Sequence, residues 1–216
     1  MADSRTTKPP AAKSIFINCP FDDGFKPILR ATVFAIISSG YHPRCALDTT
    51  DGAEIRVTKI ATMIGECDWG IHDLSCVEVD VGGMPRFNMP MELGLHLGAR
   101  LLGEARHRRK KALILEAERH RYDAARSDIS GQDIETHAND PDLAIRRVRN
   151  WLSEHRPHNA APLPGAAAMQ ADYRLFQADV GTVLAARRLD PLGDLTHSDF
   201  LFVVRDWIAS RAEVAP

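Results

Sequence analysis

Short apolar segments alternate with longer segments of helical periodicity through most of this chain, and that alternation restricts the fold more than any other feature. The strand-like runs are at 14–19, 41–47, 69–74, 112–115 and 132–137. Apolar residues three and four positions apart predict helices between and after them, at 25–37, 54–66, 90–102 and 141–152. With short connections, the pattern predicts an α/β fold with a mainly parallel sheet of about five strands and helices on both faces.

Individual residues predict which strands lie at the edges of this sheet and which lie inside it. Pro43 favours an edge position or a strand start for the second strand. The wholly apolar run 112–115 is typical of a strand covered on both faces, whereas 132–137 is expected at the other edge. Asp140 followed by Pro141 is a helix start, a cap and then a proline.

The sequence predicts four successive parts. Residues 1–13 are expected to be flexible, and 14–156 form the α/β domain. A linker follows at 157–168, and 169–216 form a C-terminal helical pair. The apolar surface of this pair is too large for an isolated hairpin, so the pair is expected to pack on the α/β domain or on another chain.

Composition excludes several classes of protein. The formal net charge of −2 gives no general attraction to nucleic acid or anionic membranes, and no apolar run approaches the roughly 20 residues of a membrane span. The four cysteines contain no C-x-x-C pair, and the nine histidines contain no H-x-x-x-H pair. A cytoplasmic chain without a metal site is expected. The basic run 106–111 is expected to be a solvated loop, with a phosphate contact as the alternative.

Polar residues follow the predicted strands at their carboxyl ends, where open parallel sheets bind ligands. They occur at 18–23 after the first strand, at 48–51 after the second, and at Asp73 after the third. Asn88 and Glu92 open the next helix. The clustering predicts a binding site at this edge of the sheet.

Glu92 is the most informative residue of this set. The stretch Arg86 to Gly94 is expected to turn from a loop into a helix, with Pro90 in its first turn and Asn88 or a neighbour as the cap. The helix is apolar almost all round and is therefore expected to be buried. Burial favours a neutral Glu92 and the helix start favours a charged one. The alternative is that Glu92 closes a cap or pairs with Arg86.

The sequence lacks a dinucleotide fingerprint, a phosphate-binding loop and a hydrolase elbow. What remains is a carboxylate site made of Glu92 and Asp73, with Asp22 or Asp23. Carboxylates suit reactions that pass through a sugar cation, which one of them stabilises or captures. The remaining residues of the expected ligand-binding set are Asn18, Cys19, Phe21, Arg86 and Asn88.

These residues have separate expected contacts. Asn18 would hydrogen-bond a ribose hydroxyl or a phosphate, and Arg86 would pair with a phosphate. Phe21 and Trp69 are candidate stacking faces for a base, and a place in the core is the alternative for each.

Three segments carry a resemblance to known families. Ile15 to Asp22 looks like the opening of TIR-like and nucleoside 2-deoxyribosyltransferase-like α/β proteins. Ile71-His72-Asp73 and the later Phe87 to Gly94 are similar to the deoxyribosyltransferase pattern, an aspartate ending a strand and then a helix opening with Glu-Leu-Gly. The resemblance covers about 14–156 and implies a flavodoxin-like or TIR-like sheet.

The resemblance implies roles for the two acids. The family's glutamate nucleophile corresponds to Glu92, and its sugar-binding aspartate corresponds to Asp73. TIR-domain NAD glycohydrolases likewise use a helix glutamate to cleave the nicotinamide–ribose bond. The chain further resembles bacterial TIR-like nucleotide-binding proteins associated with antiphage defence. The family's Asp-x-Gly-Thr step is replaced by 85–88, which favours hydrolysis over base transfer.

The sequence and the resemblance together predict an enzyme that cleaves the N-glycosidic bond of NAD or a related nucleotide, as a defence or toxin effector. Glu92 would be ionised at its helix start, and Asp73 with Asn18 would hold the ribose. The nucleotide is the substrate, and no separate cofactor is expected. The alternatives are a non-catalytic nucleotide sensor and an interaction module acting through the C-terminal helices. A homo-oligomer or an activating protein partner is compatible with each.

Overall fold

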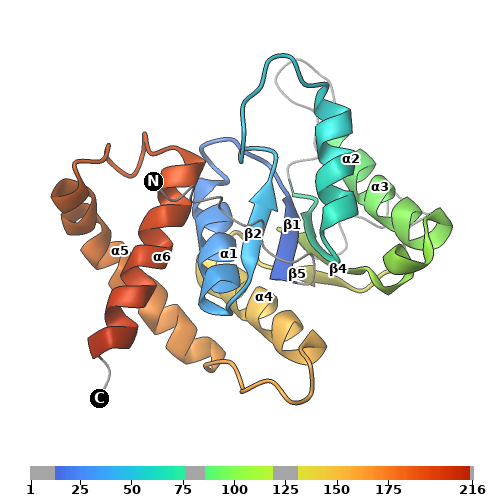
Figure 1. Cartoon of the computed structure of the whole chain (residues 1–216). Coiled ribbons are helices and arrows are strands. Elements are labelled where there is room, and N and C mark those ends of the chain that lie inside the picture. The colour runs from blue at the N-terminus through green and yellow to red at the C-terminus, as the bar shows by residue number, and fades with distance from the viewer. Residues whose placement is uncertain (1–12, 76–85, 119–130, 215–216) are drawn as a thin grey trace, which may run out of the picture.

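A computed structural model describes residues 13–75, 86–118 and 131–214 of the chain (Figure 1). All strand pairings are parallel, and the strands lie in the order β2-β1-β3-β4-β5. The strands are β1 (Ser14–Asn18), β2 (His42–Cys45), β3 (Trp69–Asp73), β4 (Lys111–Glu116) and β5 (Ile134–Thr136). The helices are α1 (Lys26–Ser38), α2 (Arg56–Glu66), α3 (Asn88–Leu102), η2 (Ala105–Arg109), α4 (Pro141–His155), α5 (Ala166–Arg187) and α6 (His197–Val214). This arrangement confirms the predicted α/β fold and the C-terminal helical pair.

The strand order fixes where a ligand site is expected. From β1 the chain first moves outward to β2, and then returns past β1 to build β3, β4 and β5 on its other side. The direction therefore changes between β1 and β3, whose registered residues include Asn18 opposite His72. Open sheets of this order bind ligands at the carboxyl ends of the strands beside such a change.

The two edge strands are those that the sequence placed at the edges. β2 carries Pro43, which donates no ladder hydrogen bond, and it pairs only with β1. β5 pairs only with β4. In the central strands the apolar side chains are buried on both faces, as expected for a sheet covered by helices.

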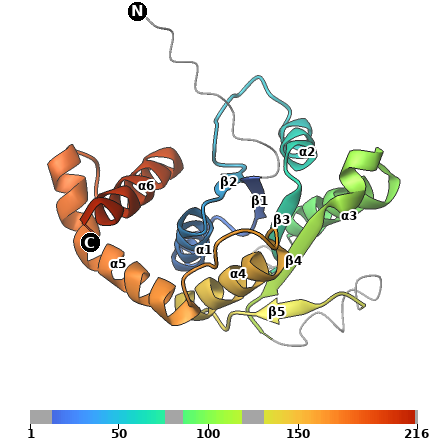
Figure 2. The same cartoon turned by 60° about the horizontal axis from the view of Figure 1, so that its bottom comes forward.

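Helices cover the sheet unequally on its two faces (Figures 1 and 2). α1 and α4 pack on one face, called here the α1 face, and α2 and α3 pack on the other, the α3 face. α5 and α6 lie outside α1 and α4 and extend the α1 face by a further layer.

Phe34 of α1 shows how closely the C-terminal pair joins the core. Its ring centroid lies 5.1 Å from that of Tyr173, 5.5 Å from Phe176 and 6.0 Å from Trp207. Aromatic pairs at these separations contribute beyond the area they bury. The expectation that the C-terminal helices pack on the α/β domain is therefore confirmed.

The connection between α4 and α5 is held to α4. The guanidinium of Arg149 donates to the carbonyl of Leu163 at 2.9 Å and to that of Pro164 at 2.7 Å. α5 begins at Ala166, so the last residues of the expected linker are already helical. Before α6, Thr196 Oγ1 accepts a hydrogen bond from the backbone N–H of Asp199 at 3.2 Å and so caps the start of the helix.

The prediction that the helix after Pro90 is buried all round was wrong. α3 begins earlier, at Asn88, and buries a single stripe consisting of Met89, Glu92, Leu93 and His96. At its end Leu102 is 90% exposed. α3 is an outer helix of the sheet, so only the side that faces β1 and β3 is covered.

The basic run also differs from its prediction at one residue. η2 buries none of its side chains, as expected for a solvated segment. Lys110, however, is fully buried, and its ammonium donates to the carbonyls of Ile64 and Cys67 at the end of α2. Carbonyls at a helix end have no partner within the helix, and Lys110 supplies one.

The predicted flexible start, residues 1–13, lies outside the described part of the chain except for its last residue. Among the described helices, none is both long enough and apolar enough to cross a membrane.

Candidate functional site

Cys19 marks the centre of the predicted site, immediately after β1. It is buried, and burial raises the pKa of its thiol well above the ordinary value. The negative charges of Asp73, Glu92 and Asp22 raise the pKa further. A thiol held neutral is a poor nucleophile. These charge effects indicate that three of the predicted acids lie near the end of β1.

Asn18, the last residue of β1, connects this strand to α3. Its amide nitrogen donates to the carbonyl of Met89 at 2.8 Å and lies 3.1 Å from Nδ1 of His72. Asn18 is fully buried, so its amide group positions the first turn of α3 rather than reaching outward. Because Glu92 lies one turn after Met89, Asn18 also fixes Glu92.

Glu92 is 3% exposed. Within the described ranges its carboxylate makes no hydrogen bond or ion pair. Burial raises the pKa of Glu92 to about 7, and the nearby positive charge of Arg56 lowers it in part. The helix start therefore does not hold the pKa of Glu92 near its ordinary value. Glu92 is beyond the first turn, where the influence of the helix dipole has declined, and desolvation dominates.

Exposed residues at the starts of α2 and α3 had no predicted role in the site. Arg56, the first residue of α2, is exposed, and its charge acts on Glu92. Phe87 and Met91 lie one helical turn apart at the start of α3 and are 65% and 47% exposed. The charge of Arg56 therefore reaches the carboxylate, and the exposed ring of Phe87 precedes Glu92 by five positions in the chain. Sequence spacing gave no signal for Arg56, because α2 and α3 meet only in the folded chain.

Asp22 and Arg86, both expected to contact a ligand, pair with each other. Arg86 Nη1 lies 2.7 Å from Asp22 Oδ2, and both side chains are partly exposed. The pair joins the β1–α1 loop to the start of α3. Arg86 therefore pairs with Asp22, and not with Glu92 as the alternative expectation had it.

The other two polar candidates of this region are exposed. Asp23 pairs with Lys26 at 2.7 Å, and the hydrogen bond from Lys26 lowers the pKa of Asp23. Asn88 is the first residue of α3, and its side chain caps no backbone N–H.

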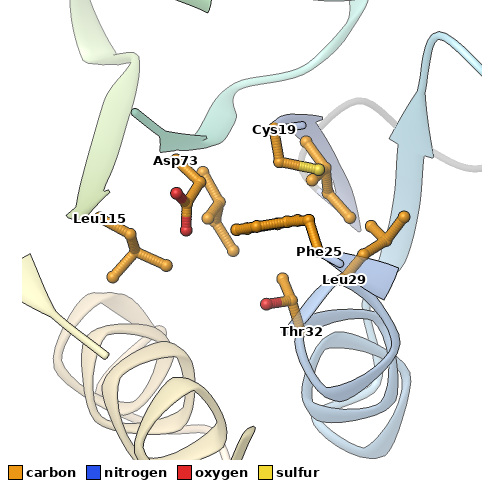
Figure 3. Close-up of a pocket in the computed structure, with 8 residues that line it drawn as sticks. Cys19, Phe25, Leu29, Thr32, Asp73 and Leu115 are labelled. Atoms are coloured by element: carbon orange, nitrogen blue, oxygen red, sulfur yellow. The ribbon is translucent and has the colours of Figure 1, made fainter. Parts of the chain in front are cut away.

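Asp73 lies on the opposite face of the sheet from Glu92. Its carboxylate accepts from the backbone N–H of Ser75 at 3.0 Å and lies 3.0 Å from Nε2 of His137. Figure 3 shows it at a cavity on the α1 face, together with Cys19, Phe25 and other residues. The cavity holds about one water molecule. The structure therefore brings Asp73 to the end of β1 without placing it beside Glu92.

Asp73, Ser75 and His137 form a buried cluster that the sequence did not reveal. The hydroxyl of Ser75 lies 3.2 Å from His137 Nε2, and the backbone N–H of Asn139 donates to His137 Nδ1 at 3.1 Å. Nδ1 is thus an acceptor, which assigns the proton to Nε2. Serine and aspartate face the same ring nitrogen, so the cluster differs from a relay that activates a serine nucleophile.

Two buried histidines, His72 of β3 and His96 of α3, form a pair on the α3 face. His96 lies one helical turn after Glu92. The rings of His72 and His96 are 4.8 Å apart, and burial is the main cause that lowers the pKa of each, to about 4 for His96. Gly70 leaves room for them, since a Cβ atom there would lie 2.6 Å from His72 Nε2. Both histidines are neutral near pH 7 and complete a polar layer behind Glu92.

The two aromatic candidates are partly buried and pack against the hydrophobic core of the α1 face. Phe21 packs against the hydrophobic core of the α1 face. Trp69 begins β3 and lies at the amino end of the sheet, with its ring centroid 5.2 Å from Tyr41 and 5.4 Å from Trp151. Neither is an exposed stacking face.

In comparisons with known proteins, no protein-family model, curated protein or solved structure matches this chain. The function is therefore argued from the site itself.

Proposed function

We propose that this protein binds a nucleotide or nucleoside at the carboxyl ends of β1 and β3 and cleaves its N-glycosidic bond, with NAD or a related nucleotide as substrate. One observation carries the proposal. Glu92 is a buried carboxylate without a hydrogen-bond partner among the described residues, and its pKa is about 7. Groups with such a pKa are concentrated at functional sites.

Glu92 would act on the sugar carbon. The bond between this carbon and the base nitrogen breaks, and its electron pair leaves with the base. The ionised carboxylate of Glu92 stabilises or captures the resulting cation. Water then supplies a hydroxyl group to the sugar carbon and releases a proton. The same role for glutamate is implied by the resemblance to deoxyribosyltransferases and TIR-domain glycohydrolases.

The surroundings of Glu92 suit the rest of such a ligand. The guanidinium of Arg56 would pair with a phosphate, and the exposed ring of Phe87 would stack on a base. Asn18 and the Arg86–Asp22 pair would hold the start of α3 in place. A role as a defence or toxin effector, and activation by assembly, rest on the resemblance alone.

A second candidate function is supported by the position of Asp73. A site with two cooperating carboxylates needs both on the same side, and Asp73 is engaged with His137 on the other face of the sheet. A sensor that binds a nucleotide without cleaving it requires only the binding surface.

Product analysis separates these functions. The purified chain is incubated with NAD and a panel of nucleosides and nucleotides, at high protein concentration, and released bases are measured by chromatography. Glu92→Gln is the test variant, and Glu104→Gln, which alters an exposed acid just beyond α3, is the matched control. Free base from wild type and control, with at least a ~10³-fold loss in Glu92→Gln, supports the glycosidase.

The other outcomes are equally decisive. Calorimetry with the same panel detects binding without cleavage. Binding that survives in Glu92→Gln, with no product from any protein, supports the sensor. Neither binding nor product would overturn both functions and favour an interaction module.

A further inference from the structure

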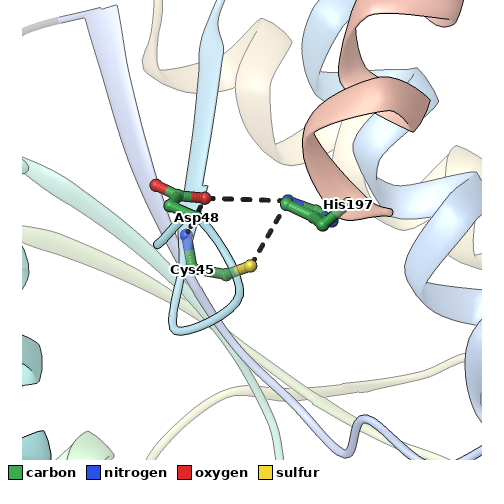
Figure 4. A group of neighbouring side chains, drawn as sticks. All are labelled: Cys45, Asp48 and His197. Carbon is green, nitrogen blue, oxygen red and sulfur yellow. Dashed lines mark hydrogen bonds and ion pairs between the residues drawn. The ribbon is translucent and has the colours of Figure 1, made fainter. Parts of the chain in front are cut away.

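A cluster of three side chains lies where the C-terminal helical pair meets the sheet (Figure 4). Cys45 ends the edge strand β2, Asp48 follows it in the next turn, and His197 is the first residue of α6. Cys45 Sγ lies 3.3 Å from His197 Nε2, and Asp48 Oδ1 lies 3.7 Å from the same nitrogen. All three donor atoms are within 4.8 Å of one another.

The two distances from His197 Nε2 are close to those between neighbouring ligand atoms of a tetrahedral zinc site. Zinc binds sulfur at about 2.3 Å and nitrogen or carboxylate oxygen at about 2.0–2.2 Å. With tetrahedral angles, neighbouring ligand atoms are then about 3.3–3.6 Å apart. The distances from His197 Nε2 to the other two donor atoms fit with shifts of a few tenths of an ångström.

Further contacts hold the carboxylate in the required orientation. Arg44 Nε donates to Asp48 Oδ2 at 2.6 Å, so the other oxygen, Oδ1, is turned toward His197. The backbone N–H of Cys45 donates to Oδ1 at 3.1 Å, which leaves this oxygen a further lone pair. The charge of Arg44 is itself balanced by Glu66, 3.5 Å away. Hydrogen bonds to the ligating groups are a regular feature of metal sites.

We propose that Cys45, Asp48 and His197 bind a zinc ion, with a water molecule in the fourth position. The combination of thiolate, imidazole and carboxylate is one that zinc accepts. Binding releases the thiol proton to solvent, and the sulfur electron pair forms the bond to zinc. Thiolate and carboxylate together neutralise the double charge of the ion, which makes the site compatible with its partly buried position.

The ion would link two parts of the chain that are distant in sequence. Cys45 and His197 are 152 positions apart, and one belongs to the sheet while the other opens α6. The proposal is independent of the glycosidase, because Glu92 lies on α3. It departs from the expectation of no metal site, which rested on the absence of closely spaced ligand pairs.

Titration of the full chain with Zn²⁺, after removal of metal by a chelator, tests the site. We expect one ion per chain by calorimetry and a higher unfolding temperature with zinc. Titration with Co²⁺ as a spectroscopic probe should give a thiolate-to-cobalt charge-transfer band. Cys45→Ser should abolish this band, and Cys45→Ser and His197→Ala should each weaken zinc binding at least tenfold.

Two control variants remove the same residue types elsewhere. Cys67→Ser alters another buried cysteine, and His158→Ala alters an exposed histidine. Both should keep the stoichiometry and the band. If Cys45→Ser does not fold, His197→Ala and Asp48→Asn are compared by the same titrations. The proposal is overturned if no saturable binding occurs, if the cobalt complex lacks the thiolate band, or if the folded site variants bind zinc as wild type does.

Discussion

The two faces of the sheet differ in what they bury. The α1 face is a continuous apolar core that extends from β1 and β3 through α1 and α4 to the C-terminal helices. The α3 face has smaller apolar clusters and places ionisable groups among them. These are His72, Glu92, His96 and Lys110. We infer that the α1 face supplies most of the apolar packing, although it also buries Asp73 with His137, whereas the α3 face holds the carboxylate to which the proposed chemistry is assigned.

The ionisable groups of the α3 face share one physical cause. Burial is the largest cause that raises the pKa of Glu92 and lowers the pKa values of His72, His96 and Lys110. In each case burial shifts the protonation equilibrium toward the neutral form, because charge is costly to remove from water. A face that buries such groups gives up part of its stability.

Truncation of one buried ring on each face tests the comparison most strongly. Phe34→Ala and Phe16→Ala both remove fully buried phenylalanines, and each should cost about 3–5 kcal/mol of unfolding free energy in denaturant titrations. Only Phe34→Ala should also loosen α5 and α6, since Phe34 contacts both. Limited proteolysis should then cut Phe34→Ala faster within 157–165. Equal cutting of the two variants would contradict the assignment of the C-terminal helices to the α1 face.

The pH dependence of stability tests the charge state of Glu92. Its folded pKa is about 7 and its ordinary value is 4.5, so the folded state binds more protons between these values. This contribution to stability is present below about pH 4.5 and is lost as pH rises through about 7. Glu92→Gln, which cannot ionise, should be more stable than wild type at pH 8 by up to about 3 kcal/mol.

The same measurement near pH 4 should show little difference between wild type and Glu92→Gln. Glu104→Gln serves as the control and should follow wild type at every pH, since Glu104 is exposed. A Glu92→Gln variant that is less stable at pH 8 would show that Glu92 is ionised and well solvated or paired.

Substitution of Gly70 tests the packing of the histidine pair. A Cβ atom at this position would lie 2.6 Å from His72 Nε2 and 2.9 Å from the ring of His96, so Gly70→Ala should lose about 1–3 kcal/mol. Gly94→Ala is the matched control, because no atom lies within 4 Å of a Cβ there and α3 is helical. It should gain up to about 1 kcal/mol. Thermal unfolding of both variants measures the contrast, and a neutral Gly70→Ala would disprove tight packing behind Glu92.

The smallest expected effect is at the start of α4, on the α1 face. Asp140 Oδ1 accepts from the backbone N–H of Asp142 at 2.9 Å and caps the helix. Asp140→Ala should cost about 1 kcal/mol of unfolding free energy, whereas Asp133→Ala, another exposed acid, should change it little. Equal losses in both would indicate a general charge effect instead of a cap.

The sequence was sufficient for the fold because local patterns encode it. Alternating apolar runs, the helix start at Asp140-Pro141 and Pro43 in an edge strand each reflect a local constraint on the backbone. Burial on α3 was predicted less well, because periodicity shows that a helix has an apolar side but not how much of it the sheet covers. Leu102 is the clearest case.

The site was predictable in part for the same reason. The carboxyl ends of parallel strands meet, so Asn18, Cys19, Asp73 and Glu92 were expected in one region. The pleat of β3 determines which face of the sheet Asp73 takes. It turns Asp73 away from the face on which Glu92 lies. Arg56 and the cluster of Cys45, Asp48 and His197 required contacts between distant elements, for which spacing gives no signal.

The position of Trp207 against Phe34 has a consequence for the order of folding. The α3 face is built from elements between β1 and β4, so it is complete early in synthesis. The outer side of α1 is covered only after α6, the last described helix, has been synthesised. Contacts between residues so far apart in sequence, such as Phe34 and Trp207, slow folding. A nascent chain would therefore expose an apolar helix surface on one side of an otherwise formed sheet, which is the kind of surface that molecular chaperones bind.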